Sequence, residues 1–356
     1  MTLFLTNDEV EQLVSVEDAI EVLEPTFADL GGGRLSSRPR TLNYTGLGDG
    51  EFYLYSSMDA SVPRYGVHLI RMTSEHLSRK MVAGFPRRFQ IPNPAGKFSG
   101  LIIMFSIEDH SPLALFQDAV LNRTMIGATS GIAAKYISRE DSEVMALLGA
   151  GWLAPTQVIG HCAVRPIREI RVYGPTEENK INLCEKMEGR VSAKLIPVNS
   201  TEEALQGADI IACATNSYEP VFDGAMLKPG HYVGSLQVGE LDDLTHETAD
   251  TITARAREPA TIWHMNSGEE PPDQLWLDRW KPHWNEKLKF LGEIVEGLDQ
   301  ARTRNDDITL YGGVGTGPSS GLGLQYIPAW VAYQRAREQG VGFEIPDELF
   351  LQDAHP

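Results

Sequence analysis

The sequence predicts an α/β protein in which a Rossmann dinucleotide-binding domain is joined to a smaller α+β domain. Three observations support this fold class. An apolar run at 144–148 leads into a glycine-rich turn, a helix and a second strand at 169–173. Strands and helices then alternate to about residue 311. Between residues 40 and 115, strand-like runs are separated only by turns, which is typical of a mixed or antiparallel sheet.

The turn after the first of these strands has the G-x-G-x-x-A spacing of dinucleotide-binding turns, since it reads Gly149, Ala150, Gly151, Trp152, Leu153 and Ala154. Gly149 permits a tight turn, Gly151 lets the backbone approach a pyrophosphate, and Ala154 allows close helix–sheet packing. The following helix offers free N–H groups to the phosphates. An ordinary βα turn is the alternative. The strand–turn–helix–strand context favours a nicotinamide-type dinucleotide site.

The composition indicates which binding partners and which cellular compartment to expect for the protein. The chain has 31 Lys+Arg against 49 Asp+Glu, a formal charge of −18, so we expect neither nucleic acid nor a membrane as a partner. Cys162, Cys184 and Cys213 form no C-x-x-C pair, and they are interpreted as reduced thiols without a metal-binding role. No signal peptide or membrane-spanning run is evident, so we expect a cytoplasmic protein.

The N-terminal region predicts a short strand and a helix within residues 2–14, then a helix over 16–30 that three glycines end. Strands are expected at 41–44, 51–56, 65–72, 100–106 and 112–116. Residues 84–97 are rich in proline and basic side chains, and we expect a mobile loop there. A long helix with many small residues, 118–137, is expected to pack closely and to lead into the dinucleotide domain.

The second half predicts the remaining Rossmann elements: strands at 193–198, 209–214, 230–235, 250–254 and 308–311, with a short helix at 201–206. Residues 258–287 are rich in tryptophan, and they are interpreted as an insertion over the active site or against a partner chain. The alternative is a surface helix pair with packed tryptophans. A last helix is expected at 319–339. Residues 1–124, completed by 318–356, form one predicted domain, and residues 125–317 form the Rossmann domain.

These patterns, taken in order, resemble the ornithine cyclodeaminase/mu-crystallin family over residues 3–342. The most specific parts are the segment 121–124 with its small-residue helix, the glycine turn, and the segments 209–215, 228–235 and 240–242. The resemblance implies a homodimer whose N-terminal domain makes the dimer and holds the substrate. It also implies NAD(H) or NADP(H) as cofactor. Members either interconvert imines and amino acids or cyclise ornithine-like substrates with loss of ammonia.

Three residues are the candidate catalytic groups that the resemblance indicates. Arg123 stands at the family position for a carboxylate-binding arginine, with an interdomain salt bridge as the alternative. Arg40 resembles the second family arginine, although Arg38 could match instead, or Arg40 could be a solvated loop residue. His68 stands where the family usually has a substrate-binding lysine, and could act as acid, base or anchor, or be a satisfied strand histidine. By alternation Arg71 faces away from His68, so it is a poor substitute for that lysine.

A second departure from the family follows the strand that ends at Ser235. Cyclodeaminases carry an aspartate just after this Gly-Ser pair, which they need for proton transfer. Here Leu236 or Gln237 takes that place. Glu240 or Asp242 could move in, but we expect them to cap the next helix.

The cofactor type depends on the end of the second Rossmann strand, where NAD sites usually have an acid. No acid stands at this tip, and Thr176, Asn179 and Lys180 could surround a 2′-phosphate, while Glu177 and Glu178 argue against one. NADP is therefore slightly favoured over NAD. Thr124, in the helix at 118–137, is a further predicted cofactor contact. A glycine-rich turn after residue 311 could face the nicotinamide or simply be flexible. The remaining predicted contacts lie after strands: Pro175, Thr215, Asn216, Ser235 and Gly313.

The sequence therefore predicts an NAD(P)-dependent oxidoreductase that reduces an imine or oxidises the corresponding small amino acid. Two alternatives stay open. One is a cyclodeaminase-type lyase that releases ammonia from a diamino acid with recycled NAD. The other is a non-catalytic NADP(H)-binding protein like the crystallin relatives.

Overall fold

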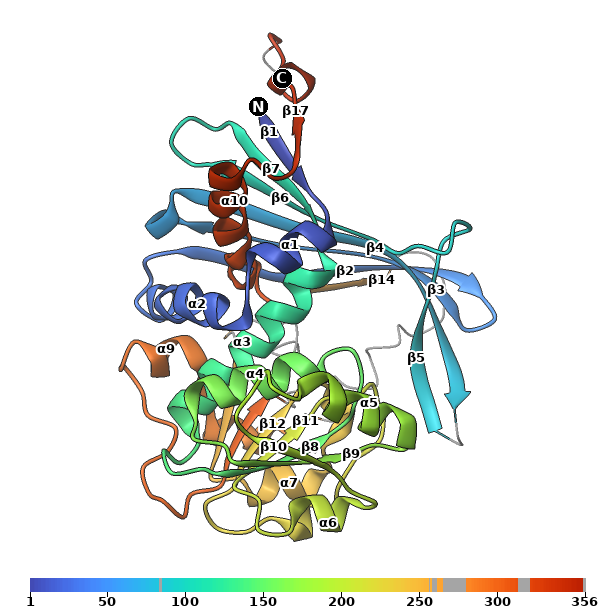
Figure 1. Ribbon diagram of the computed structural model, residues 1–356, viewed down its shortest axis with the longest axis vertical. Helices are drawn as coiled ribbons and strands as arrows, with labels where there is room; N and C mark the ends of the chain where they lie inside the picture. Colours follow the sequence, from blue (N-terminus) through green and yellow to red (C-terminus); the bar gives the residue numbers. More distant parts are fainter. Residues whose placement is uncertain (83–84, 256, 258–260, 265–279, 313–320, 355–356) are drawn as a thin grey trace.

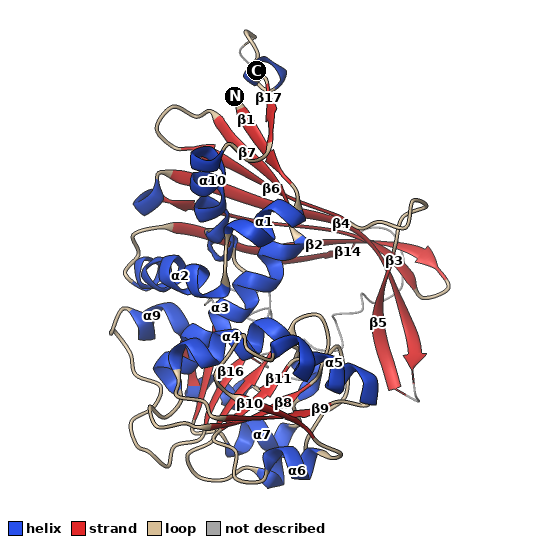
Figure 2. Cartoon of the chain, in the orientation of Figure 1, coloured by secondary structure: helices blue, strands red, loops and turns tan. Residues whose placement is uncertain are grey.

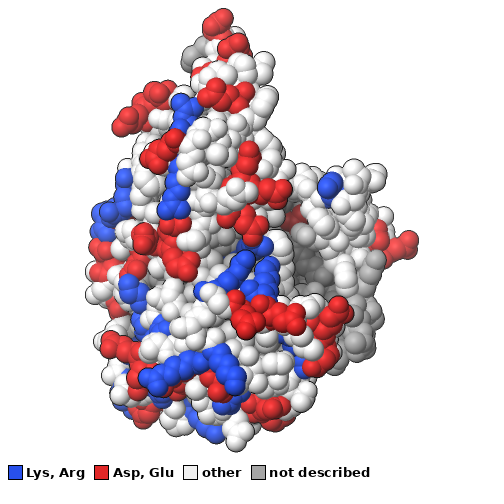
Figure 3. Space-filling view, viewed as in Figure 1, with Lys and Arg blue, Asp and Glu red and all other residues white. Residues whose placement is uncertain are grey.

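The computed structural model describes residues 1–82, 85–255, 257, 261–264, 280–312 and 321–354. Two β-sheets lie one above the other, and helices fill the space between them (Figures 1 and 2). Acidic side chains are spread over both parts of the surface in Figure 3, with lysines and arginines in smaller groups, as the net charge of −18 leads one to expect. Within the described residues, no helix combines the length and apolar character needed to cross a bilayer.

The first sheet has the order β14-β2-β3-β4-β6-β7-β1-β17, with β5 paired to β4. Most neighbours are antiparallel, whereas β1–β7 and β14–β2 are parallel, so the predicted mixed sheet is confirmed. The central strands are longer than predicted. Their bounds are β1 Thr2–Leu5, β2 Ser36–Gly48, β3 Glu51–Val62, β4 Val67–Val82, β5 Phe85–Ile91, β6 Ser99–Ser106, β7 Pro112–Gln117, β14 Thr261–His264 and β17 Phe343–Ile345.

The loop predicted at 84–97 is wrong for residues 85–91, which form strand β5 and pair antiparallel with β4. Pro86 does not prevent this, because β5 pairs with β4 alone and an edge strand tolerates a residue that lacks an N–H. The two strands extend as a long hairpin beside the second sheet (Figure 1). Among the described residues from 85 to 98, those at 92–98 lie outside strands.

The second sheet is parallel throughout, in the order β10-β9-β8-β11-β12-β16-β13-β15. Its first five strands have the Rossmann order 3-2-1-4-5, with the switch point between β8 and β11. The predicted strands are confirmed, and no end differs by more than two residues; the short strand β15 was not predicted. The bounds are β8 Val144–Leu148, β9 Glu169–Tyr173, β10 Lys194–Pro197, β11 Ile210–Cys213, β12 Tyr232–Ser235, β13 Thr251–Ala254, β15 Leu288–Phe290 and β16 Thr309–Gly312.

The first two helices begin where the sequence provides caps. Thr6 and Ser15 each form a capping box, which starts α1 and α2. The predicted last helix is instead a short 3-10 turn, η5 (Gly323–Tyr326), followed by α10, which starts at a proline. The α-helices are α1 Asn7–Leu13, α2 Val16–Gly31, α3 Ala119–Ile137, α4 Ala154–Val164, α5 Glu177–Met187, α6 Thr201–Leu205, α7 Asp243–Thr248, α9 Leu291–Val295 and α10 Pro328–Gln339. The remaining 3-10 turns are η1 Pro63–Tyr65, η2 Gly224–Met226, η3 Val238–Glu240, η4 Pro282–Lys287 and η6 Asp347–Leu349.

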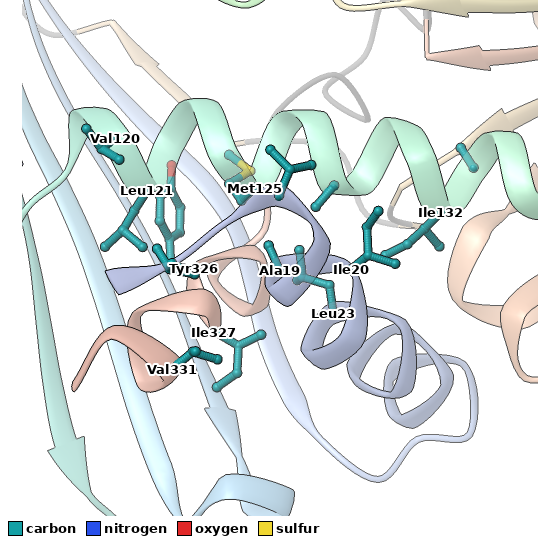
Figure 4. Close-up of a cluster of buried hydrophobic side chains, with 14 of the residues drawn as sticks. Ala19, Ile20, Leu23, Val120, Leu121, Met125, Ile132, Tyr326, Ile327 and Val331 are labelled. Carbon is teal, nitrogen blue, oxygen red and sulfur yellow. The ribbon is translucent and has the colours of Figure 1, made fainter. Parts of the chain in front are cut away.

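Helix α3 lies between the sheets and packs closely, as predicted. One side of it contacts α2, η5 and α10 through a buried apolar cluster (Figure 4). Another side meets α4 through glycines. A Cβ on Gly160 would lie 2.2 Å from the Gly127 carbonyl oxygen, and one on Gly131 would lie 2.6 Å from the Gly160 oxygen. The two helices therefore touch backbone to backbone, and α3 fixes the dinucleotide-turn helix α4 in place.

The tryptophan-rich segment links the two sheets. After β13 the chain leaves the second sheet, and residues 261–264 pair with β2 of the first sheet. The chain lies against the second sheet again at Trp284, which is buried in the core of that sheet. The Trp284 ring stacks on His246 with ring centres 4.4 Å apart. Trp280 packs edge-on against Trp284. The two tryptophans are packed, as the alternative expected, but the described residues of this segment form strand β14 and the 3-10 turn η4 and not a surface helix pair. Residues 265–279 lie outside the described part of the chain.

Candidate dinucleotide and substrate site

The glycine turn lies between the carboxyl ends of β8, β9 and β11. Gly149 has a φ of 113° and donates its N–H to the Tyr173 oxygen at 2.8 Å. A Cβ on Gly149 would lie 2.4 Å from the Ala214 oxygen, so only glycine fits. A Cβ on Gly151 would meet no described atom within 4 Å, and Ala154 is fully buried at the start of α4. The turn therefore has a tight, fixed base and an open face, which suits a pyrophosphate.

No described side chain caps the start of α4, where Leu153 is the N-cap residue. Ala154 nevertheless donates its N–H to the Gly151 oxygen at 3.1 Å, and Pro155 has no N–H. The prediction that this helix offers free N–H groups to the phosphates is therefore wrong for its first two residues. Trp152, in the same turn, is 59% exposed. The Arg123 guanidinium lies 4.4 Å above the centre of its indole ring and forms an ion pair with Glu11 of α1. The arginine expected to bind a substrate carboxylate thus contacts Trp152 and Glu11 beside the dinucleotide turn. The next residue of α3, Thr124, is buried.

At the end of β9, Pro175 and Thr176 are exposed, and α5 begins at Glu177. Lys180, however, is buried. Its ammonium group donates to the Val198 oxygen at 2.7 Å and pairs with Glu177 at 2.6 Å. This geometry does not support the expected contact between Lys180 and a 2′-phosphate, because the lysine instead ties α5 to the end of β10.

Glu240 connects the loops that follow β11 and β12. Its carboxylate accepts five hydrogen bonds, from the Thr215 N–H and hydroxyl, the Ser235 hydroxyl, and the N–H groups of Leu236 and Gln237, at 2.6–2.9 Å. Burial raises the pKa of Glu240, and these donors limit the rise. Glu240 therefore shapes the two loops and does not cap α7. The expected cap comes from Asp242, which accepts the Thr245 N–H at 2.7 Å.

The ends of β12 and β16 approach one another closely. Gly312 has a φ of 80°, and a Cβ there would lie 2.1 Å from the Ser235 oxygen. Asn216 is exposed at the end of β11. The loops after β8, β11 and β12 thus lie along the carboxyl edge, where open α/β sheets bind ligands. Gly313, a predicted cofactor contact, lies outside the described residues.

A buried polar cluster lies where β4 of the first sheet meets the start of α3 and the turn η5. Arg71 of β4 donates from Nε and Nη2 to one Asp118 oxygen, at 2.9 and 2.7 Å, and its guanidinium lies 5.7 Å from the centre of the Tyr326 ring. The Tyr326 hydroxyl donates to Asn122 at 2.8 Å. Burial raises the pKa of Tyr326, and the positive charges of Arg71 and Arg40 oppose this rise. Arg71 therefore lies beside the Tyr326 ring, and the charge of Arg40 acts on the same hydroxyl.

His68 does not join this cluster. Val67, Leu69, Arg71 and Thr73 form the buried face of β4, so His68 lies on the opposite face, with its Nδ1 2.8 Å from the Ser61 hydroxyl. Arg38 also lies elsewhere, paired with Asp59. Sequence reasoning missed Arg71. Alternation alone gave no sufficient signal, because both faces of this strand carry apolar residues and the sequence does not show which face is buried.

The three cysteines are free, and burial raises the pKa of the Cys162 thiol to about 11. Cys213 is buried within β11. Such thiols are poor nucleophiles. In the described part of the chain, no group of three His, Cys, Asp or Glu side chains is arranged to hold a metal ion.

A parallel sheet with the Rossmann strand order, a glycine turn at its switch point and a second sheet that supplies the buried Arg71 define the class of Rossmann-type dinucleotide-binding proteins. The particular family follows from comparison. The sequence model of the ornithine cyclodeaminase/mu-crystallin family matches residues 1–318, so the chain belongs to that family.

Among curated relatives, the Delta(1)-pyrroline-2-carboxylate reductase of Bacillus cereus is 28% identical over 276 residues, which cover 76% of this chain and 81% of the relative. Among solved structures, the Delta(1)-pyrroline-2-carboxylate reductase of Thermococcus litoralis, in complex with NADH and L-proline, has 25% identity and a TM-score of 0.74, covering 97% of this chain and all of that one. An archaeal alanine dehydrogenase dimer with bound NAD has 24% identity and a TM-score of 0.76, covering 97% of this chain and 99% of that one. This last likeness supports the fold.

Proposed function

We propose that the chain is a nicotinamide-dinucleotide-dependent oxidoreductase that reduces an imine of a small carboxylic acid to the amino acid, or runs the reverse oxidation. The observation that carries this is the dinucleotide turn at 149–154, with a fixed base and an open face at Gly151. The two reductase relatives, one solved with NADH and L-proline, support the same chemistry. When bound, the reduced nicotinamide supplies the hydride.

Arg40 and Arg71 hold the substrate carboxylate in this proposal. Arg71 lies beside the buried Tyr326 ring, where Asp118 fixes its guanidinium through two hydrogen bonds. The positive charge of Arg40 acts on the same tyrosine. A guanidinium held in this way presents its remaining donors in a set direction, which suits a planar carboxylate. His68, on the other face of β4, is left without a direct part in the reaction.

Reduction of an iminium ion requires no acid from the loop after β12. The hydride adds to carbon, the π electrons of the C=N bond move to nitrogen, and its positive charge is neutralised. That loop carries Leu236 and Gln237, whose N–H groups both bind Glu240. Glu240 itself accepts five hydrogen bonds, so it is a poor base for deamination. These contacts support the reductase over a cyclodeaminase-type lyase.

The choice between NAD and NADP is a separate proposal. Lys180, on which the preference for NADP partly rested, is buried and paired with Glu177. Glu177 and Glu178 place two carboxylates in the first turn of α5. Acids at this position suit ribose hydroxyls and repel a phosphate. These residues support NAD over NADP.

We also propose a homodimer, formed through the outer face of the first sheet. The strands there carry apolar side chains that remain partly exposed, namely Ile70, Met72, Leu101, Ile103 and Phe105. A sheet face of this kind is usually covered by another surface. The dimer of the archaeal alanine dehydrogenase supports this assembly by analogy of fold.

An assay of reduced-nicotinamide consumption with cyclic and acyclic imino acids tests the function. Consumption that requires the substrate carboxylate is the expected result. Ammonia release from a diamino acid without net consumption would identify a lyase, and tight NADH binding without turnover of any imine would identify a binding protein. A thermal-shift comparison of NAD with NADP tests the nucleotide, because the form that binds the folded state more tightly raises the midpoint further.

A further inference from the structure

The face of β4 that carries Arg71 has a second charged side chain, Glu75. Arg71, Thr73 and Glu75 are two residues apart along the strand, so their side chains point to the same face of the sheet. Leu54 of β3 stands directly opposite Glu75, and it is buried together with Leu77 in a small apolar cluster. Glu75 itself is half-buried. A carboxylate between this cluster and the buried Arg71 is costly unless donors and cations stabilise it.

Hydrogen bonds fix the Glu75 carboxylate through both of its oxygens. One oxygen accepts the Thr73 hydroxyl at 2.7 Å, and the other accepts the Gln90 side-chain amide of β5 at 2.6 Å. Because Thr73 gives its single hydroxyl proton to Glu75, the Ser56 hydroxyl must be the donor in the 2.7 Å bond that joins it to Thr73. Ser56 and Thr73 are both buried. Donors of this kind stabilise the ionised carboxylate, so Glu75 is a negative charge with a set position.

The charge of Glu75 reaches the site where the substrate carboxylate is proposed to bind. Burial raises the pKa of Tyr326, and the negative charges of Asp118 and Glu75 add to this rise. Burial lowers the pKa of Arg71, but its neighbours, Asp118 and Glu75 among them, outweigh this effect and the pKa is raised. Glu75 therefore acts on two side chains at the centre of the buried polar cluster.

A count of charges indicates which form of the substrate this cluster binds. The described charged and titratable side chains around this face of β4, Glu75 included, are two cations, two anions and two phenols: Arg40, Arg71, Asp118, Glu75, Tyr44 and Tyr326. Near pH 7 the phenols are neutral, so the four charges cancel. The nearby ion pair of Arg123 and Glu11 adds no net charge. A bound carboxylate adds one negative charge, which a positively charged substrate nitrogen would balance.

We propose that Glu75 is a positioning residue that keeps the bound substrate in its positively charged iminium form. The inference rests on the proposed reduction of an imine. In that reaction the imine nitrogen takes up a proton from solvent, hydride adds to the carbon, and the π electrons of the C=N bond become the lone pair of the amine nitrogen. Protonation makes the carbon a far better acceptor of hydride, so a fixed negative charge beside the site favours the reactive form.

The first test measures how the rate of a single turnover depends on pH, by stopped flow with saturating NADH and a five-membered cyclic α-imino acid. The rate should fall at high pH, as the bound iminium ion loses its proton. We expect Glu75→Gln to move this fall to lower pH by about one unit, since a charge several ångströms away has an effect of that order. On the falling limb the variant should thus be about tenfold slower than the wild type, and at low pH nearly as fast.

Two matched variants separate the charge from the structure. Glu75→Asp keeps the charge and should restore the pH profile at least in part. Glu51→Gln removes a carboxylate from the opposite face of the same sheet, where Glu51 pairs with His76 at 2.8 Å, and should leave the profile as in the wild type. The dissociation constant for NADH should stay within twofold of the wild type in all three variants, which shows that each is folded.

A second measurement needs no turnover. In the presence of NAD, calorimetry compares the binding of L-proline, whose nitrogen is positively charged, with that of tetrahydrofuran-2-carboxylate, whose ring oxygen is neutral. The wild type should bind proline roughly tenfold more tightly or better, and Glu75→Gln should lose most of this preference.

Either an unchanged pH profile or an unchanged preference in folded Glu75→Gln overturns the role of Glu75 and leaves the proposed reduction standing. A wild type that binds NADH but reduces no imine overturns the reduction and this role together.

Discussion

At the scale of single residues, the site depends on a few buried charges. Arg71 and Asp118 pair beneath Tyr326, and Glu240 gathers the loops after β11 and β12. A buried charge is costly unless it is paired. The same pairing gives these side chains fixed directions, which a site for a small, rigid substrate requires.

Arg71→Met is expected to raise the KM for the imino acid by roughly 30- to 100-fold, since a charged hydrogen bond contributes about 2–3 kcal/mol and 1.4 kcal/mol corresponds to a factor of ten. The affinity for NADH should stay within twofold of the wild type. Because the variant leaves the Asp118 carboxylate buried and unpaired, the double variant Arg71→Met, Asp118→Asn is the control for stability. An unchanged KM in a folded variant would exclude Arg71 as an anchor.

Stability is expected to fall between pH 6.5 and pH 4 through His161. Burial lowers the pKa of this histidine to about 4, while its Nδ1 lies 2.8 Å from the Gln157 oxygen. The unfolded chain titrates near pH 6.5, so it binds more protons than the folded chain in this interval, and unfolding is favoured as the pH falls. The effect is at most about 3 kcal/mol.

The check is urea unfolding of wild type and His161→Phe at a series of pH values. The variant should lose part of the slope between pH 4 and 6.5. It should keep the part due to His231, whose pKa is also lowered to about 4 by burial. Identical slopes in the two proteins would show that His161 does not contribute.

Residue roles were predictable from the sequence only where they depend on local geometry. The spacing of Gly149 and Gly151 was enough to predict the turn, because backbone conformation and the lack of a Cβ determine what it can bind. The partners of Arg71, Lys180 and Glu240 are distant in sequence or depend on burial. Alternation predicted that Arg71 and His68 face opposite ways, but not which face of β4 is the buried one.

At the scale of elements, the contact of α3 with α4 holds the dinucleotide helix against the rest of the molecule. Gly160→Ala is expected to destabilise the protein by roughly 1–3 kcal/mol, because the new Cβ would lie 2.2 Å from the backbone oxygen of Gly127 and the helices must separate. This opposes the gain in helix propensity, about 1 kcal/mol.

The matched control is Ala163→Gly at an exposed position of the same helix, which should cost only the propensity difference, about 1 kcal/mol. Chemical unfolding measures both variants. A stabilised Gly160→Ala protein would mean that the helices can move apart without cost.

Helices and strands were predictable where a periodic run of apolar residues is bounded by turn or capping residues. The strands of the second sheet are short apolar runs bounded by turn residues, so their positions were close to those observed. Strand β5 was missed because a proline argues against a strand. The proline is tolerated because β5 pairs with β4 alone, and this pairing depends on the tertiary fold. The three-residue strand β15 has too few residues for a pattern.

At the scale of the whole molecule, we expect light scattering to give twice the mass of one chain. Ile103→Glu should yield a monomer, because it places a charge in the middle of the partly exposed apolar face of the first sheet. Leu244→Glu is the control, since Leu244 is an exposed apolar residue of α7 in the other half of the molecule. A monomeric wild type would contradict the proposed dimer.

The segment 261–264 also determines how the protein can be dissected. The chain passes from the first sheet to the second before β8 and returns to the first sheet after β13. It enters the second sheet again after β14 and ends in the first sheet after β16. Each half is therefore assembled from non-contiguous stretches of polypeptide. Cutting one peptide bond cannot release either half as an autonomous fragment, so truncation and domain-swap experiments require permuted or multiply spliced genes.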